Sequence, residues 1–496
     1  MVNISTQTYN VPGAYVNEGS MGAVNQELAD HANCYMIGTG TQGMEDIPTL
    51  VQSYPDFVNT FGTSPSLKSV RMFFLQKPGR GINFIRVSKK TTQTLELADG
   101  ETVTQGEVYT LTINSFAYSV VAAANNEDVI AKLAALLREQ PAYVGSISGG
   151  VLRLPSGTTV TASVNLELGS PVVPASVGLQ DIADSLDKLD LNLAQGFLIA
   201  PEFYEAFTVS TDRDTLHQIL EAFVSQPTFN WAQIADVGLN AGTETEPSLF
   251  VQKCLAERVN KASPKGHSWL YAPYIKDSNG AFVPYSAFQA ALQIKAMLGN
   301  SFFTPAAGEK YPLTGGTFVV DISEPVNGAL YSKQINCGRN FKDGTGYLTW
   351  GAKTLSTSPF YIDIVTRLVL NVIARTARDA FRKFTFEVVS GYTGVTMNSA
   401  TATAISIAER IFRAGGLFGV TSADAYLVVC DERNNTPADL QNNRLHVFLA
   451  VKPSPIAQYI IIDLVRVSLD VILVNLFQSQ DGTSADVPVE EEEQQD

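Results

Sequence analysis

A glycine-rich segment follows the first strongly apolar run of the chain and has a spacing that can bind phosphate. Residues 38–43 (GTGTQG) fit the GxGxxG pattern directly after the strand-like run 33–37. That pattern holds a dinucleotide when its last glycine lies in a helix whose N-terminus faces the pyrophosphate. Here the acidic, proline-containing stretch 44–48 follows. We therefore interpret the segment as a plain glycine-rich turn and predict no cofactor.

Two Gly-Thr-Ser segments, 62–64 and 482–484, resemble part of a serine-hydrolase nucleophile motif. A hydrolase also needs a histidine base that a carboxylate orients. The histidines are scattered and none precedes a glycine, and the cysteines form no CxxC pair. We therefore predict neither a catalytic triad nor a metal site. We expect the cysteines to be buried free thiols and the chain to fold in a reducing compartment. The residues concerned are His31, His217, His267 and His446, and Cys34, Cys254, Cys337 and Cys430.

A basic stripe is predicted on one long helix. Arg367, Asn371, Arg375, Arg378 and Arg382 are spaced by four, four, three and four residues, which places them on one face of a helix over 362–384. Two interpretations are open: a solvated face, or a docking face for an acidic partner.

The composition limits the classes of function. The chain has 496 residues, 45% hydrophobic and 17% charged, which is typical of folded protein and predicts two to four domains. The formal charge of −15 argues against binding to nucleic acid. Three charged residues interrupt the most apolar stretch, 459–477, and the N-terminus lacks a signal-peptide pattern. We therefore predict neither membrane insertion nor secretion by a signal peptide.

The remaining elements place these motifs. A short helix is predicted at 54–61, ending at Gly62. Between residues 176 and 325, apolar strand-like runs alternate with helical patterns, which predicts a mainly parallel sheet covered on both faces. Residues 362–384 and 402–414 are predicted helices, and strands are predicted at 425–430, 446–452, 459–466 and 469–477. Residues 91–172 differ in sequence pattern from the rest of the chain, with alternating strand-like runs around one helical pattern. This pattern predicts a small inserted α+β domain on the surface.

Several ordered motifs resemble those of contractile tail sheath proteins from myophages, bacteriocins and injection systems. Residues 11–18 (VPGAYVNE) are similar to the family's PGVYVxE opening, and residues 38–43 with 53–62 to its glycine-rich run and the S-x-x-x-F-x-x-x-F-G pattern after it.

Motifs later in the chain continue the resemblance in the same order. Residues 271–274 (YAPY) resemble Y-x-P-W, and 350–354 (WGAKT) resemble W-G-A-R-T, with Lys353 in place of arginine. Residues 434–440 (NNTPADL) resemble N-N-T-P-x-D-I. The segment 91–172 matches no part of the family core.

The resemblance implies an α+β multidomain fold. It implies an α/β subtilisin-like central domain without a catalytic triad, an α+β C-terminal core domain, and terminal arms that donate strands to neighbouring subunits. The expected segments are an N-terminal arm (1–20), the N-terminal part of the core (21–90), the inserted domain (91–172), the α/β domain (173–330), the C-terminal core (331–467), a C-terminal arm (468–480) and an acidic disordered tail (481–496).

The family's strand-donating arms have candidates at both ends of this chain. The residues expected to make these intersubunit contacts are Tyr9, Val11, Tyr15 and Val16 in the first arm and Val471, Leu473 and Asn475 in the second. The basic stripe, with Arg367, Arg375, Arg378 and Arg382, is the candidate face toward an inner tube.

The resemblance implies a structural subunit and not an enzyme. Such a subunit polymerises helically around an inner tube and contracts to drive the tube through a cell envelope. Its expected partners are copies of itself, the tail tube protein, and the baseplate and tail terminator proteins, in a virion tail assembled in the host bacterial cytoplasm. The alternatives are the sheath of a bacterial injection system or tailocin, an α/β enzyme, and another virion protein.

Overall fold

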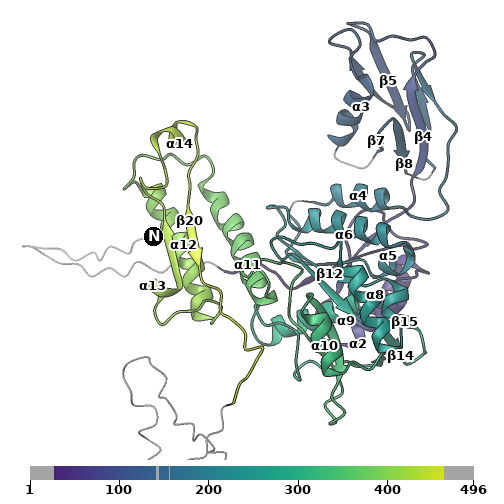
Figure 1. Cartoon of the computed structure of the whole chain (residues 1–496). Helices are drawn as coiled ribbons and strands as arrows, with labels where there is room; N and C mark the ends of the chain where they lie inside the picture. The colour runs from purple at the N-terminus through teal and green to yellow at the C-terminus, as the bar shows by residue number, and fades with distance from the viewer. Residues whose placement is uncertain (1–26, 141–143, 156, 191, 463–496) are drawn as a thin grey trace, which may run out of the picture. The chain divides into compact units, whose positions relative to one another are not determined.

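The computed structural model describes residues 27–140, 144–155, 157–190 and 192–462. The chain divides into two units, residues 1–455 and 456–496, and the helices and strands below belong to the first (Figure 1). In the second unit, the described residues 456–462 form no helix or strand. The predicted strand at 459–466 is therefore wrong in its described part. The predicted arms and the acidic tail lie outside the described residues.

An eight-stranded sheet forms the centre of the first unit, and its six inner strands are parallel, as predicted. The two outer strands, β18 and β2, run antiparallel to their neighbours. In spatial order the strands are β18 (Tyr347–Trp350), β17 (Ile335–Asn340), β13 (Ser268–Ala272), β12 (Ala232–Asp236), β11 (Gly196–Ile199), β1 (Asn33–Gly38), β3 (Ile82–Arg86) and β2 (Thr49–Val51).

This sheet draws strands from three of the predicted segments. β1 pairs with β11 although the inserted domain separates them along the chain, and β13 pairs with β17 across the predicted boundary at 330. Strands within 33–86 and 335–350 therefore complete the α/β sheet. Every residue of β11, β12 and β13 is buried, which is why these strands read as continuous apolar runs.

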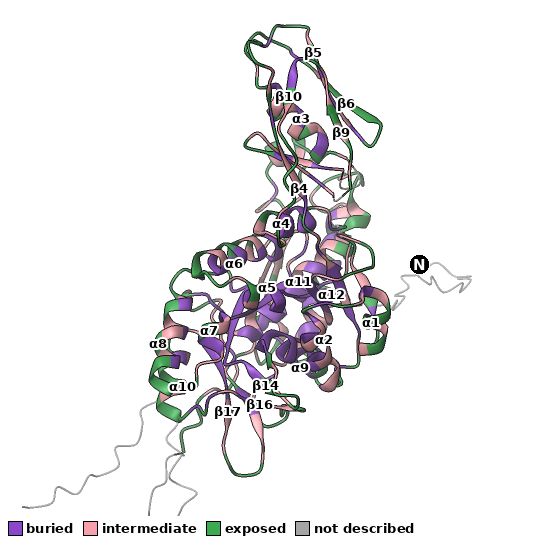
Figure 2. Cartoon of the chain, turned by 90° about the vertical axis from the view of Figure 1, so that its right-hand side faces the viewer, coloured by how far each residue is buried: buried purple, intermediate pink, exposed green. Residues whose placement is uncertain are grey.

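Helices cover both faces of the sheet, and β12 lies between α6 and α9 (Figure 1). On one face, buried side chains of α4, α6, α8 and α10 join those of the strands in one apolar cluster. On the other, α9 packs between the sheet and α2, and most of its residues are buried (Figure 2). The helices are α1 (Tyr54–Phe61), α2 (Leu67–Leu75), α4 (Leu179–Asp187), α5 (Pro201–Ala206), α6 (Ser210–Val224), α7 (Leu239–Gly242), α8 (Pro247–Arg258), α9 (Tyr285–Gly299) and α10 (Glu324–Tyr331), beside a small sheet of β14 (Ile275–Asp277), β15 (Phe282–Val283) and β16 (Gly316–Phe318).

The segment between β3 and α4 folds around an apolar cluster of its own, in agreement with the expected α+β texture. Two small antiparallel sheets pack with one helix. Its elements are β4 (Thr91–Leu97), β5 (Val108–Ile113), β6 (Phe116–Val121), α3 (Val129–Arg138), β7 (Ser146–Ser148), β8 (Val151–Leu154), β9 (Val160–Ala162) and β10 (Leu166–Leu168).

After β18 the chain enters two long helices and a two-stranded antiparallel sheet. The predicted helix at 362–384 is present as α11 and a short 3₁₀ turn, whereas the helix predicted at 402–414 begins seven residues earlier. No helix in the described part of the chain is both long and apolar enough to span a bilayer. These elements are α11 (Ile364–Phe381), the 3₁₀ turn (Arg382–Phe384), α12 (Val395–Arg413), α13 (Ser422–Ala425), β19 (Tyr426–Val429), α14 (Pro437–Gln441) and β20 (Phe448–Val451).

Candidate functional site

The glycine-rich segment 38–43 forms the turn after β1, as predicted, and leads into no helix. The amide of Thr39 donates to a carboxylate oxygen of Glu202 at 2.9 Å. The hydroxyls of Thr39 and Ser66 donate to the same carboxylate at 2.5 and 2.6 Å. Glu202 is buried, so a phosphate placed here would meet a buried negative charge. The hydrogen-bond donors of Thr39 and Ser66 at this turn are therefore already used by the carboxylate of Glu202.

The histidines lie in different environments. His217 and His267 each contact a backbone carbonyl oxygen, at 3.2 and 2.8 Å, and burial lowers the pKa of both to about 4. Ser64, from the first Gly-Thr-Ser segment, accepts a hydrogen bond from a nearby amide. Within the described residues no three His, Cys, Asp or Glu side chains gather where they could hold a metal. The second Gly-Thr-Ser segment lies outside those residues.

Asp236 stands at the carboxyl end of β12 and anchors α9. Its carboxylate accepts hydrogen bonds from the amide and hydroxyl of Ser286, at 2.7 and 2.5 Å. Burial raises the pKa of Asp236 to about 7, although the hydrogen bonds from Ser286 act in the opposite direction. The folded chain therefore holds a proton here at pH values where the unfolded chain has released it.

The raised pKa of Asp236 predicts an unusual dependence of folding stability on pH. Because the folded pKa lies above the unfolded value of about 3.9, the contribution of Asp236 to stability is full below pH 4 and falls as the pH rises to about 7. We expect the stability of Asp236→Asn, measured relative to the parent chain by urea unfolding, to improve by about 1.4 kcal/mol per pH unit across this window. A difference that stays constant from pH 4.5 to 8 would contradict the assignment.

The inner half of the basic stripe docks α11 against the sheet. Arg367 donates to the carbonyl oxygen of Lys265 at 3.2 Å, and Asn371 donates to that of Trp231 at 3.3 Å. The carbonyl oxygen of Asn371 accepts from the side chain of Gln195 at 2.7 Å. These three partners precede β13, β12 and β11, so α11 crosses the amino ends of parallel strands. Two of the carbonyl groups there, those of Lys265 and Trp231, accept hydrogen bonds from side chains of the helix.

The outer half of the stripe continues onto neighbouring loops. Arg375 donates to Asp379 at 3.0 Å and to the carbonyl oxygen of Asn192 at 3.3 Å. Arg378 donates to the carbonyl oxygen of Thr228 at 2.5 Å.

Both interpretations of the stripe, a solvated face and a docking face, expected exposed side chains, and this is wrong for Arg367 and Arg375, which are 5% and 7% exposed. Arg378 is partly buried, and the side chain of Arg382 is 63% exposed. Four-residue spacing identifies a face of a helix but does not say whether water or backbone carbonyl groups lie opposite it.

Residues 350–354 turn the chain from β18 toward α11 around the buried amide of Asn336. That amide donates to the carbonyl oxygens of Lys353 and Leu270, at 2.7 and 3.2 Å, and accepts from the Lys353 amide at 2.8 Å. A Cβ atom at Gly351 would lie 2.8 Å from the Asn336 oxygen, so only glycine fits beside it. Residues 350–354, one of the motifs that resemble the sheath family, thus connect β18 to α11 through contacts with Asn336. We call this connection the Asn336 joint.

Asn336→Asp should break the hydrogen bonds that Asn336 donates, with almost no change in the volume of the side chain. The carboxylate replaces a donor that serves two carbonyl oxygens, so a buried charge would face two acceptors. We expect the free energy of unfolding to fall by about 2–4 kcal/mol. Chemical denaturation measures this loss, and Asn340→Asp, at the partly exposed end of the same strand, is the control. Equal losses in the two variants would contradict the role of Asn336.

Residues 434–440 join β19 to β20. The Asn434 side chain donates to the last carbonyl of β19 at 2.9 Å. Asn435 is fully buried, donates to the carbonyl oxygen of His446 and accepts from its amide. Thr436 and Asp439 then form a capping box at the start of α14. This motif therefore closes the end of the hairpin.

The hairpin of β19 and β20 has free strand edges among the described residues. Each strand pairs only with the other there, so each has an edge without a partner strand. Its residues are exposed or only partly buried, and Leu427 and Phe448 are 56% and 52% exposed. A two-stranded sheet is marginal alone, and a free strand edge accepts a further strand.

Sequence reasoning missed Glu202, and it read the inner arginines as surface residues. Glu202 follows Pro201 just past the end of a buried strand, and an acidic residue at the carboxyl edge of a parallel sheet is a usable signal. The predicted arm residues, 9–16 and 471–475, lie outside the described residues.

No protein-family model and no curated protein matches this sequence. Solved structures do match. The PVC sheath complex of an extracellular contractile injection system, in its contracted state, aligns with 93% of this chain and 99% of its own, at 16% identity and a TM-score of 0.57.

The helical sheath of the anti-feeding prophage in its contracted state aligns with 92% of this chain and 100% of its own, at 16% identity and a TM-score of 0.57. A chain of the anti-feeding prophage baseplate aligns with 93% and 100%, at 15% identity and a TM-score of 0.55. Identities this low establish the fold alone. The resemblance to contractile sheath proteins is confirmed at that level.

Proposed function

We propose that this chain is the subunit of a contractile sheath, which polymerises helically around an inner tube and shortens to drive that tube through a cell envelope. The observation that carries the proposal is the fold, shared over nearly the whole length of both chains with sheath proteins of injection systems. The role is structural, which agrees with a glycine-rich turn that Glu202 closes.

Assembly would use strand addition. The N-terminal arm, with Tyr9 and Val16, and the C-terminal arm, with Val471 and Asn475, would each pair with the hairpin of a neighbouring copy. The free edges of β19 and β20 support this. Each main-chain hydrogen bond contributes about 0.5–1.5 kcal/mol, so an arm with six bonds holds by several kcal/mol. Such a joint tolerates rotation of the bodies that it connects.

Contraction would then be a change between two packings of the bodies, with the extended packing held by the tube and baseplate. No nucleotide is needed in this scheme. The tube-facing part of the basic stripe would be its outer end, Arg378 and Arg382, since Arg367 and Arg375 are buried.

The remaining features of the proposal rest on the resemblance. The α/β body would be a subtilisin-like domain without a triad, and the partners would include tube, baseplate and tail terminator proteins. The particle would be a phage tail assembled in a bacterial cytoplasm, or alternatively an injection system or tailocin.

Electron microscopy of the purified chain tests the function. We expect hollow tubes with helical striations after concentration of the protein. Compact particles, or monomers that persist at high concentration, would argue for another virion protein or an enzyme. Identification of the neighbouring genes separates a phage tail from an injection system.

A further inference from the structure

The inserted domain is built as a unit that is nearly closed on itself. Its apolar cluster contains residues only from 95–168 and shares none with the cluster of the central sheet. The chain enters and leaves it at one place, because Thr92 and Val172 exchange two backbone hydrogen bonds of 2.8 Å. The backbone therefore connects the domain to the body through two adjacent strands.

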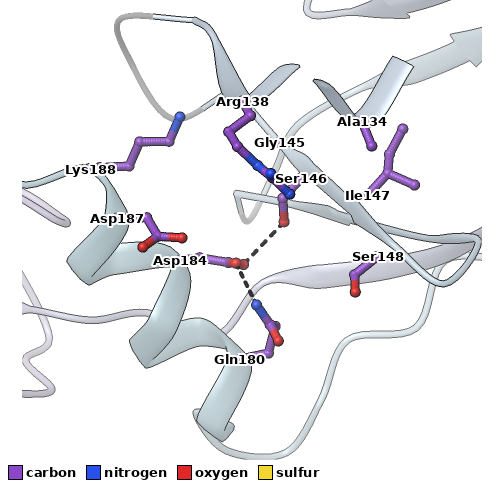
Figure 3. Close-up of a pocket in the computed structure, with 10 residues that line it drawn as sticks. All are labelled: Ala134, Arg138, Gly145, Ser146, Ile147, Ser148, Gln180, Asp184, Asp187 and Lys188. Atoms are coloured by element: carbon purple, nitrogen blue, oxygen red, sulfur yellow. Dashed lines mark hydrogen bonds between the residues drawn. The ribbon is translucent and has the colours of Figure 1, made fainter. Parts of the chain in front are cut away.

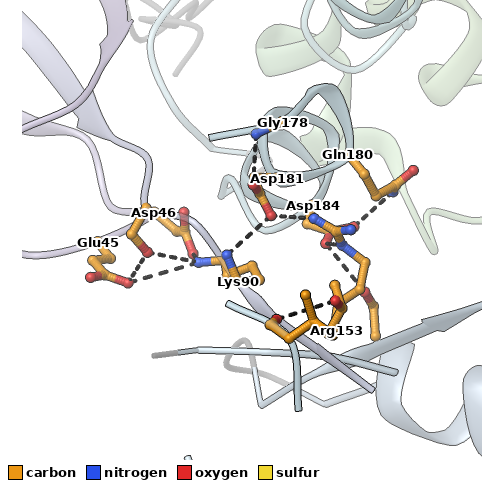
Figure 4. Close-up of polar contacts among 12 residues, drawn as sticks. Glu45, Asp46, Lys90, Arg153, Gly178, Gln180, Asp181 and Asp184 are labelled. Atoms are coloured by element: carbon orange, nitrogen blue, oxygen red, sulfur yellow. Dashed lines mark hydrogen bonds and ion pairs between the residues drawn. The ribbon is translucent and has the colours of Figure 1, made fainter. Parts of the chain in front are cut away.

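Beyond those strands, side chains of the domain contact the body, and an arginine makes an ionic contact with it. Arg153, on β8, contacts Asp181 and lies 3.2 Å from Asp184, both buried on α4 (Figure 4). The hydroxyl of Ser146 donates to Asp184 at 3.2 Å. We refer to the group Arg153, Asp181 and Asp184 as the latch. A guanidinium between two carboxylates is strongly directional, so it fixes orientation as well as distance.

The space beside the latch is not closed by apolar packing. A cavity of about 140 Å³ lies between the domain and α4, lined by both sides (Figure 3). Arg138 and Ser148 line it from the domain, and Gln180, Asp187 and Lys188 from the body. A space of this size, lined by both polar and apolar side chains, has room for several water molecules. Beside the latch, the domain therefore meets α4 across a pocket and not across a fully packed interface.

The carboxylate of Asp181 also makes hydrogen bonds within the body itself. Asp181 caps α4 by accepting from the Gly178 amide at 2.8 Å, and it accepts from the amide of Lys90 at 3.3 Å. The ammonium of Lys90 is buried and lies 2.8 Å from Asp46. Substituting Asp181 would thus disturb the body itself, whereas Arg153 belongs to the domain.

We propose that the inserted domain is an autonomous module whose orientation on the body is set by the Arg153 latch, and that it pivots on the strands at Lys90–Thr92 and Val172 when the latch is broken. This does not depend on whether the chain forms a sheath.

Spin-label distances in the full chain test the proposal. All four native cysteines are buried, so labels can be directed to Thr161→Cys on the domain and Gln218→Cys on α6, with labelled chain diluted in a large excess of unlabelled chain. We expect Arg153→Gln to broaden the distance distribution at least twofold. Lys132→Gln, which removes a cation from a surface ion pair of the same domain, should leave the width unchanged.

Hydrogen exchange distinguishes pivoting from unfolding. In Arg153→Gln, amides of β5 and α3 should keep the protection that they have in the parent chain, because the domain's core is its own. An unchanged distance distribution in this variant would overturn the latch. Loss of protection in β5 and α3 would overturn the autonomy of the module.

Discussion

Replacing Arg367 with methionine should lower the free energy of unfolding by about 3 kcal/mol or more. The side chain is 5% exposed and serves the carbonyl oxygen of Lys265 and the ring of His267. The partly buried Glu221 also interacts favourably with its charge. Methionine fills a similar volume but leaves these groups without their donor, and breaking a buried charged contact is strongly destabilising.

Arg382→Met is the matched control, since it lies on the same stripe at the exposed end of the helix. We expect its effect to stay within about 0.5 kcal/mol. Urea unfolding of both variants measures the contrast. Similar stabilities for the two would mean that the whole stripe is a surface feature, as the spacing alone suggested.

The same reasoning makes charge reversal at Arg375 unsuitable as a test of tube binding. A glutamate there would face Asp379 and the carbonyl oxygen of Asn192 in a buried site. Failure of such a variant to assemble would reflect damage to α11, so tests of tube binding belong at Arg382.

Deleting residues 1–18 should yield folded chains that do not polymerise. Under the proposed function, this segment supplies a strand to the hairpin of a neighbour, whose edges have no partner within the described residues of one chain. Several main-chain hydrogen bonds per subunit would be lost, about 0.5–1.5 kcal/mol each. Because every contact repeats along a helix, this loss multiplies over the assembly.

Sedimentation and electron microscopy measure the result, with circular dichroism to show that the body stays folded. A strand-breaking change at the acceptor, Leu449→Pro in β20, should reproduce the defect from the other side of the joint. The matched control is a truncation at the opposite end of the chain, in which residues 481–496 are removed and assembly should persist. Regular tubes from the shortened N-terminus would show that strand addition by this arm does not hold the polymer.

Much of the fold follows from local pattern. Buried strands such as β12 and β13 read as apolar runs, and α1 has the bounds that the sequence predicts, with Gly62 directly after its last residue. What the pattern could not supply was pairing between distant segments. Nothing near Cys34 in the sequence indicates that β1 pairs with β11 beyond the inserted domain.

For the candidate site too, the sequence identified residues but not the tertiary contacts that they make. Motifs at 350–354 and 434–440 were found from their residues, but their roles as joints depend on contacts with Asn336 and His446 that arise only in the folded chain. Arg367 was singled out correctly as part of a stripe, yet its burial depends on which loops reach α11.

The adjacent ends of the inserted domain also bear on how the chain folds during synthesis. β1 leaves the ribosome long before β11, the strand with which it pairs, and a long flexible segment between them would oppose the pairing entropically. Once the domain has folded around its own core, Thr92 and Val172 lie side by side. The effective loop from β3 to β11 is then shorter by the length of the domain, so early folding of the domain makes it easier for β11 to reach β1.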